Sequence, residues 1–196
     1  MMEIKPWFSN FMAHSYLKEI NNKKLEKYCL ELKRTTKGRS ISNYLGWQSY
    51  DLSLETPALA PLLQAIRKEI PFFENLLSLK KEYNLKFINM WANINNHAHM
   101  NRPHDHPRMI LSGVYFVTAP PRSGELRFMN PHPANFDMIN KIVDTWNVYN
   151  SGEVFFKPEP SKLVIFPGHL IHYVLPNQSK KNRISLSFNI SVEEFI

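Results

Sequence analysis

The chain has 196 residues, of which 43% are hydrophobic and 21% charged, and it carries a formal net charge of +7. This composition is typical of one globular domain and excludes a low-complexity chain. The single cysteine excludes an internal disulfide, and no apolar run is long enough for a membrane span, so we expect a cytoplasmic protein. The positive charge would suit nucleic acid, but no RNA-binding or zinc-finger motif accompanies it, and nucleic acid is therefore not the favoured partner.

The first 84 residues predict helices. Asn21 or the asparagine after it can cap a helix in which apolar residues recur every three or four positions. Thr56 and Pro57 resemble the N-cap and first position of a second helix, which Pro71 should break or kink.

From Leu85 onward, short runs of β-branched and aromatic residues alternate with Pro, Gly and Asn, which is typical of a β-sandwich or barrel. The expected strands are Lys86–Ile94, Met109–Thr118, Glu125–Met129, Glu153–Phe156, Lys162–Phe166, Ile171–Leu175 and Asn182–Val192. Helices followed by strands indicate one α+β, mainly β domain over residues 1–196. A helical N-terminal part, about residues 1–84, would buttress a cupin-type jelly roll, or double-stranded β-helix, over about residues 85–196.

The last expected strand has two chemically different faces, because successive side chains alternate across a strand. One face carries Ile184, Leu186, Phe188 and Ile190, and the other carries Arg183, Ser185, Ser187 and Asn189. A polar face normally contacts water. The strand at Lys86–Ile94 also places Asn89, Trp91 and Asn93 on one side, so we interpret both polar faces as lining an interior cavity.

Histidines are concentrated in the middle of the chain. His104 and His106 are two residues apart, so on an extended strand both imidazoles project from the same face and can bind one ion. The pair His97 and His99 is a rival that spacing alone does not exclude. A third ligand would come from a distant strand, where the segment FPGHLIHYV supplies His169 and His172.

Arg183 and Ser185 follow on the polar face of the last strand. A guanidinium can hold one carboxylate bidentately and a hydroxyl can support it, while a metal chelates the other end of the same ligand. This pattern therefore predicts a dicarboxylate that bridges the arginine and the metal.

These residues occur in segments that together resemble the 2-oxoglutarate- and Fe(II)-dependent oxygenases of marine bacteria and their phages. The segments are LGWQSYDL at Leu45–Leu52, WANI at Trp91–Ile94, NRPHDHPRMILSGVYFV at Asn101–Val117, GELRFMNP at Gly124–Pro131, LVIFPGHLIHYVLPN at Leu163–Asn177 and RISLSFNI at Arg183–Ile190. The resemblance implies an oxidoreductase with Fe(II), 2-oxoglutarate and O2, which hydroxylates an unidentified substrate and releases succinate and CO2. It also implies a bacterial cytoplasm, including that of a phage-infected host.

By this resemblance, His104, His106 and His172 bind the metal and form the catalytic centre. Arg183 and Ser185 receive the far carboxylate of 2-oxoglutarate. Three further residues are candidates for lining the cosubstrate pocket, namely Asn93, Tyr115 and Asn101.

The wider oxygenase superfamily uses two histidines and one carboxylate in an H-x-D/E arrangement, whereas the second position here is His106. Asp105 is an alternative ligand. We prefer His106, because strand alternation separates Asp105 from His104, although a bulge at a neighbouring proline would reverse that choice.

Two other functions are compatible with the pattern. One is a three-histidine cupin-like metalloprotein that does not use 2-oxoglutarate, and the other is a non-catalytic jelly-roll binding module. Phosphate-binding loops and the G-x-S-x-G elbow are absent from the sequence, which argues against nucleotide hydrolysis and serine esterase chemistry. The substrate itself, whether a protein side chain, a nucleobase or a small metabolite, is not encoded in any motif that transfers between proteins.

Overall fold

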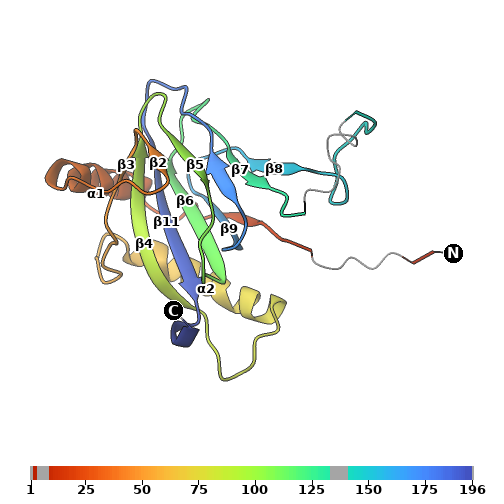
Figure 1. Cartoon of the computed structure of the whole chain (residues 1–196). Coiled ribbons are helices and arrows are strands. Elements are labelled where there is room, and N and C mark those ends of the chain that lie inside the picture. Colours follow the sequence, from red (N-terminus) through yellow and green to blue (C-terminus); the bar gives the residue numbers. More distant parts are fainter. Residues whose placement is uncertain (1, 4–8, 133–140, 196) are drawn as a thin grey trace.

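The computed structural model describes residues 2–3, 9–132 and 141–195, which form two antiparallel β-sheets and a pair of α-helices (Figure 1). The major sheet has the order β1 (Ala13–Tyr16), β9 (Lys162–Pro167), β6 (Leu111–Thr118), β11 (Arg183–Ser191), β4 (Lys86–Asn95) and β3 (Trp47–Gln48). The minor sheet has the order β2 (Asn43–Tyr44), β5 (Met100–His104), β10 (His172–Val174), β7 (Leu126–Met129) and β8 (Glu153–Phe156). The expected double-stranded β-helix is therefore confirmed.

The first helix, α1 (Asn22–Thr35), begins where the sequence predicts. The side chain of Asn21 accepts a hydrogen bond of 3.1 Å from the backbone N–H of Lys24, which satisfies one of the free donors of the first turn. Leu25 and Cys29 are buried on its apolar stripe. The cysteine is thus a small buried hydrophobe, and burial raises the pKa of its thiol to about 12.

The second helix, α2 (Ala60–Leu76), begins later than predicted and is not broken at Pro71. Thr56 does not cap it, because the backbone N–H of Leu59 first closes a turn onto the Thr56 carbonyl. The helix begins at Ala60, with a proline in its first turn. Pro71 lies inside the helix and does not end it, although proline removes one backbone hydrogen bond. In the described part of the chain, no helix has the length and apolarity needed to cross a lipid bilayer.

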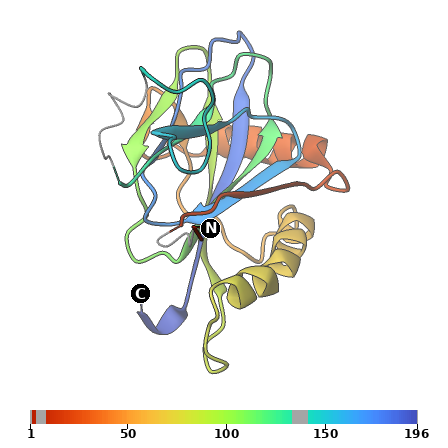
Figure 2. The same ribbon diagram turned by 90° about the vertical axis from the view of Figure 1, so that its right-hand side faces the viewer.

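The N-terminal part contributes strands as well as helices, which the sequence reading did not predict. β1 pairs with β9, and the two lie side by side in Figure 2. β2 pairs with β5 in the minor sheet, while β3 pairs with β4 in the major sheet. These strands have two to four residues, too few for a two-residue period to be recognised. The segment that holds β2 and β3 therefore joins the two sheets along one edge.

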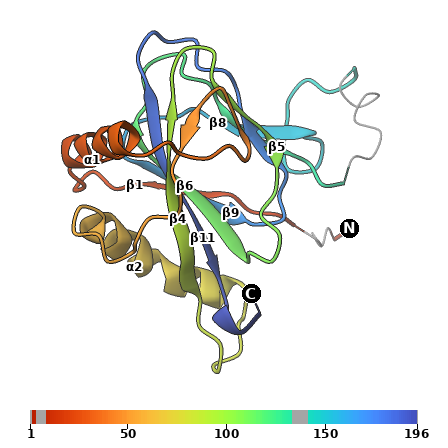
Figure 3. The same ribbon diagram turned by 60° about the vertical axis from the view of Figure 1, so that its left-hand side comes forward.

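Apolar residues form two separate cores. Both helices lie on the same outer face of the major sheet (Figure 3), and the larger core fills the space between them and that face. A smaller core lies between the two sheets and consists of Val114, Phe116, Leu126, Phe128, Val164, Phe166 and Leu170. The apolar face of β11 belongs to the larger core, as the alternation predicts. Its polar face is thereby directed to the interior between the sheets.

Candidate functional site

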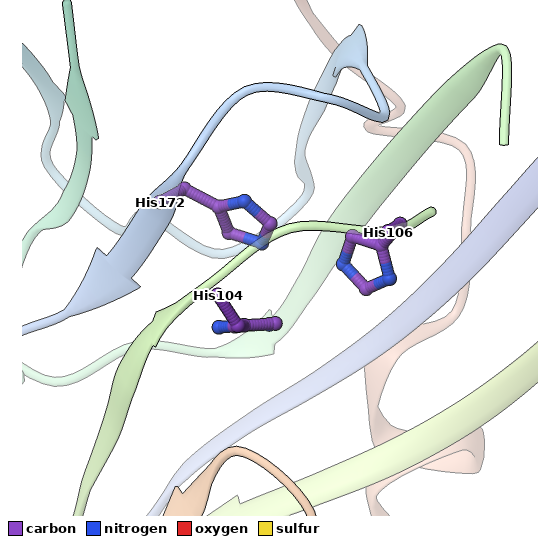
Figure 4. Close-up of side chains that lie close together, drawn as sticks. All are labelled: His104, His106 and His172. Carbon is purple, nitrogen blue, oxygen red and sulfur yellow. The ribbon is translucent and has the colours of Figure 1, made fainter. Parts of the chain in front are cut away.

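Three histidines meet between the sheets. His104 ends β5, His106 follows two residues later, and His172 begins β10, which pairs with β5 so that His172 lies opposite His104. The ring centroids are 4.3 Å apart for His104 and His172, 5.2 Å for His104 and His106, and 5.1 Å for His106 and His172. Figure 4 shows the three rings around a common space. Their potential ligand atoms lie within 4.8 Å of one another, so a single metal ion could be held by all three.

Backbone carbonyls orient two of these rings. The Nδ1 atom of His104 lies 2.7 Å from the Arg102 carbonyl oxygen, and the Nδ1 atom of His172 lies 2.8 Å from that of Leu170. A neutral imidazole that donates from Nδ1 presents the lone pair of Nε2, which is the form that binds metals. The backbone N–H of His106 donates to the Gly168 carbonyl at 2.8 Å and fixes the loop after β5. The rings are thus held in place by the fold.

Burial keeps the three imidazoles neutral. It lowers the pKa of His172 to about 3 and that of His106 to about 4, with a smaller contribution from the positive charge that His104 would carry. Burial also lowers the pKa of His104. Because only the neutral ring has a free lone pair, all three are available as ligands at neutral pH.

The competing ligand candidates lie elsewhere. Asp105 is exposed and is not part of the cluster, in agreement with the preference for His106. His97 is exposed, and the Nδ1 atom of His99 instead accepts a 3.1 Å hydrogen bond from the backbone N–H of Asn96. His169 is exposed, with its Nε2 atom 3.1 Å from the side-chain oxygen of Asn10. The structure therefore brings together the H-x-H pair and His172.

The lowered histidine pKa values predict a pH-dependent stability of the metal-free protein. In the unfolded chain each histidine has a pKa of about 6.5, so protonation below that pH favours unfolding until the folded pKa is reached. The free energy of unfolding should fall by up to about 1.4 kcal/mol per pH unit for each buried histidine as the pH drops from 6.5 to 5. Denaturant unfolding at a series of pH values measures this slope. If His106→Leu had the same slope as the wild-type protein, the pH dependence would not come from the buried histidines.

A buried arginine without a counterion lies in the same cavity. Arg183 is only 1% exposed, and its Nη1 atom donates to the carbonyl oxygens of Ser123, Gly124 and Leu175, the latter two at 3.3 Å. Its Nη2 atom has no hydrogen-bond partner, and no ion pair among the described residues involves this arginine. Burial lowers its pKa to about 9, which still leaves the guanidinium charged at neutral pH. An uncompensated buried cation is costly, so this position favours an anionic ligand.

The cavity joins the histidines to the arginine. Its lining includes all three histidines, Arg183, Ser185, Asn93 and Asn101. Asn93 donates to the Ser187 hydroxyl at 3.1 Å, while its own side-chain oxygen is buried and has no partner in the described part of the chain. A ligand that binds a metal at one end and carries a carboxylate at the other therefore finds complementary groups within one cavity.

Tyr115 does not line this cavity, so its expected role is wrong. Its hydroxyl donates to the side-chain oxygen of Asn22 at 2.7 Å, and its ring is buried in the larger core. Its neighbours Val114 and Phe116 face the cavity instead, because side chains alternate along β6. Tyr115 therefore anchors α1 to the sheet.

Four further residues of the interior lie in or near the cavity, and only two of them were expected there from the sequence. Ser42 and Ser187 line the cavity, and the Trp91 ring lies 5.7 Å from the His106 ring. Gln48 is buried, its Oε1 atom has no partner among the described residues, and it stands beside Asn93 in the register of β3 and β4. Alternation along β4 and β11 placed Trp91 and Ser187 on the faces expected to line a cavity, and both residues line it. No signal marks Ser42 or Gln48, because each belongs to or adjoins a two-residue strand.

Comparisons with known proteins agree with this geometry. The model of the family described as "Putative 2OG-Fe(II) oxygenase", where 2OG is 2-oxoglutarate, matches residues 89–189, slightly more than half of the chain. A search of curated proteins found no match.

Several solved structures share the fold. A Pseudomonas putida prolyl-4-hydroxylase has a TM-score of 0.65 and 15% sequence identity, with 93% of this chain and 92% of that chain covered. A Trichoplax adhaerens prolyl hydroxylase in complex with a hypoxia inducible factor peptide fragment has a TM-score of 0.67 and 12% identity, with 95% and 84% covered. HygX from Streptomyces hygroscopicus with nickel, 2-oxoglutarate and hygromycin B bound has a TM-score of 0.64 and 9% identity, with 94% and 84% covered.

Proposed function

Because the chain belongs to the 2-oxoglutarate- and Fe(II)-dependent oxygenase family, we propose that His104, His106 and His172 bind its Fe(II) and that Arg183 and Ser185 receive the far carboxylate of 2-oxoglutarate. The observation that carries this assignment is the shared cavity, in which three converging neutral imidazoles and an arginine without a counterion line one space. Asn93 and Asn101 line the cosubstrate pocket in this proposal, and Tyr115 does not.

The side chains that line the cavity fit both Fe(II) and 2-oxoglutarate. Three imidazoles leave about three of the six coordination positions of Fe(II) for other ligands, such as a bidentate 2-oxo acid. These ligands are uncharged, so the metal charge is balanced only when a dianion arrives. Bound Fe(II), 2-oxoglutarate and O2 together supply the oxidising chemistry, in which succinate and CO2 are released as the substrate is hydroxylated.

The chain's own contribution is orientation and the exclusion of water. The Phe166 ring lies 4.6 Å from the His172 ring and the Phe128 ring lies 5.8 Å from it, so apolar side chains surround this ligand. Trp91 flanks His106 on the major sheet. A site that is walled by aromatic rings strengthens the electrostatic contacts inside it and protects reactive species from solvent.

The substrate is a peptide side chain or a small molecule in this proposal. Among proteins of the same fold, one was solved with a peptide fragment and another with hygromycin B. A nucleobase is the third class to be tested, because the chain carries a net charge of +7. Succinate formation that rises above the uncoupled level when a candidate is added would identify the class.

Anaerobic titration tests the proposed function directly. We expect Fe(II) to bind with a stoichiometry of one, and a visible charge-transfer band to develop only after 2-oxoglutarate is added. Admission of O2 should then yield succinate. Metal binding without the band would indicate a cupin-like metalloprotein that does not use 2-oxoglutarate, and a failure to bind metal would indicate a non-catalytic module.

A further inference from the structure

The loop between β6 and β7 contacts Arg183, which lines the cavity. The carbonyl oxygens of Ser123 and Gly124 come from this loop, and the third comes from Leu175, which directly follows β10. The backbone N–H of Leu175 also donates to the Glu125 carbonyl at 2.9 Å, which ties the two segments together. All three carbonyls accept from Nη1 of the guanidinium. We call this group the carbonyl cradle.

Gly124 is the residue that permits the cradle. Its φ angle is +89°, a conformation that side chains rarely adopt. A Cβ atom at this position would lie 2.0 Å from the Leu175 carbonyl oxygen and 2.9 Å from Nη1 of Arg183. Any other residue would therefore have to displace either the cradle or the guanidinium.

The cradle restricts how an anion can approach. A guanidinium offers a carboxylate two parallel N–H groups either from its end, with Nη1 and Nη2, or from its side, with Nε and Nη2. The two N–H groups of Nη1 are already directed to three carbonyls. Nη2 is buried without a partner in the described residues. Only the side edge remains for a ligand, which refines the simple fork expected from the sequence.

We propose that Gly124 is a positioning residue for the cosubstrate, because the carbonyl cradle that it permits holds Nη1 of Arg183 and leaves the Nε and Nη2 edge to bind the far carboxylate. This inference rests on the proposed function. A positioning role for Gly124 differs from a merely structural role for the loop in one measurable respect. Displacement of the guanidinium should weaken only ligands that carry the far carboxylate, whereas general loosening of the cavity should weaken all 2-oxo acids equally.

The experiment compares two ligands on the Fe(II)-loaded protein under anaerobic conditions. 2-Oxoglutarate and 2-oxovalerate have the same five-carbon chain and the same metal-chelating end, but 2-oxovalerate lacks the far carboxylate. We expect the wild-type protein to prefer 2-oxoglutarate by about 100-fold or more, since contacts between buried charged partners are worth several kcal/mol. Gly124→Ala should reduce this preference at least about tenfold, with the affinity for Fe(II) unchanged.

Gly38→Ala is the matched control. Gly38 also has a positive φ angle of +72°, and a Cβ atom there would lie 2.4 Å from Nε1 of Trp47. The same Cβ atom would lie 2.6 Å from the backbone carbonyl oxygen of Gln48, so this substitution also crowds a backbone carbonyl, but it does not touch Arg183. This variant should keep the wild-type preference for 2-oxoglutarate.

Arg183→Lys decides the question if Gly124→Ala does not fold. The ammonium group of lysine would donate its N–H groups to the same cradle and leave none for a carboxylate, so this variant should lose the preference despite its positive charge. A preference within tenfold of wild type in Arg183→Lys, or an unchanged preference in folded Gly124→Ala, would overturn the positioning role alone. A wild-type protein that binds Fe(II) but not 2-oxoglutarate would overturn the proposed function, and this inference with it.

Discussion

Replacement of His172 by alanine is expected to abolish stoichiometric Fe(II) binding while the chain remains folded. His172 is the only one of the three clustered histidines that comes from β10, and it lies opposite His104 on the neighbouring strand. The two remaining imidazoles come from one short segment, and among the described residues no carboxylate joins them in the cluster. Mutation of a residue that only hydrogen-bonds to a metal ligand typically lowers the metal affinity about 10–100-fold. Removal of the ligand itself should therefore lower the Fe(II) affinity more than about 100-fold.

The fold should survive because His172 is neutral and packs at the edge of the smaller core. Truncation of its ring leaves a cavity beside Phe166 and Phe128, which should lower the free energy of unfolding by about 1–3 kcal/mol. Circular dichroism and thermal unfolding measure this change, and iron analysis after anaerobic dialysis measures the binding. His169→Ala is the control, because His169 is exposed three residues earlier and should not affect iron. Stoichiometric iron in His172→Ala would exclude the proposed ligand set.

The features that could be predicted from the sequence are those with a strict two-residue period. Alternation along β11 predicted that Arg183 and Ser185 share a face directed away from the helices, and the structure places both in the cavity. The same rule separated Asp105 from His104 and favoured His106, in agreement with the observed cluster. His172 was predicted only together with His169 from the spacing. The resemblance to a known family selected between them.

What could not be predicted depends on contacts between segments that are distant in the sequence. Tyr115 was assigned to the wrong face of β6, because the sequence does not show that α1 covers the outer side of the major sheet and offers Asn22 to the hydroxyl. The carbonyl cradle uses backbone atoms of Gly124 and Leu175, whose positions follow from the pairing of β7 with β10. The strands β1, β2 and β3 are stabilised by partners elsewhere in the sheets and not by their own short sequences.

Replacement of Arg183 by leucine should remove the affinity for 2-oxoglutarate without removing Fe(II). Arg183 is the charged side chain among the described residues that line the cavity, and it is 1% exposed. Truncation of one member of a buried charge pair typically costs about 2–5 kcal/mol of binding free energy. The Kd of 2-oxoglutarate should therefore rise by at least about 30-fold. Anaerobic titration of the Fe(II)-loaded variant, followed by the charge-transfer band, measures this change. Binding of 2-oxovalerate should be nearly unaffected, because it makes no use of the guanidinium.

The stability of Arg183→Leu depends on two opposing effects of the same substitution. Leucine removes the cost of burying a guanidinium whose Nη2 atom has no partner, but it leaves the carbonyls of Ser123, Gly124 and Leu175 without their donor. These effects offset each other, so the variant should fold. Ser185→Ala removes a hydroxyl but keeps the charge of Arg183, so it should weaken the binding of 2-oxoglutarate by only about tenfold. If Arg183→Leu bound 2-oxoglutarate as tightly as wild type, the buried cation would serve another anion, and the cosubstrate would have to be held by the metal alone.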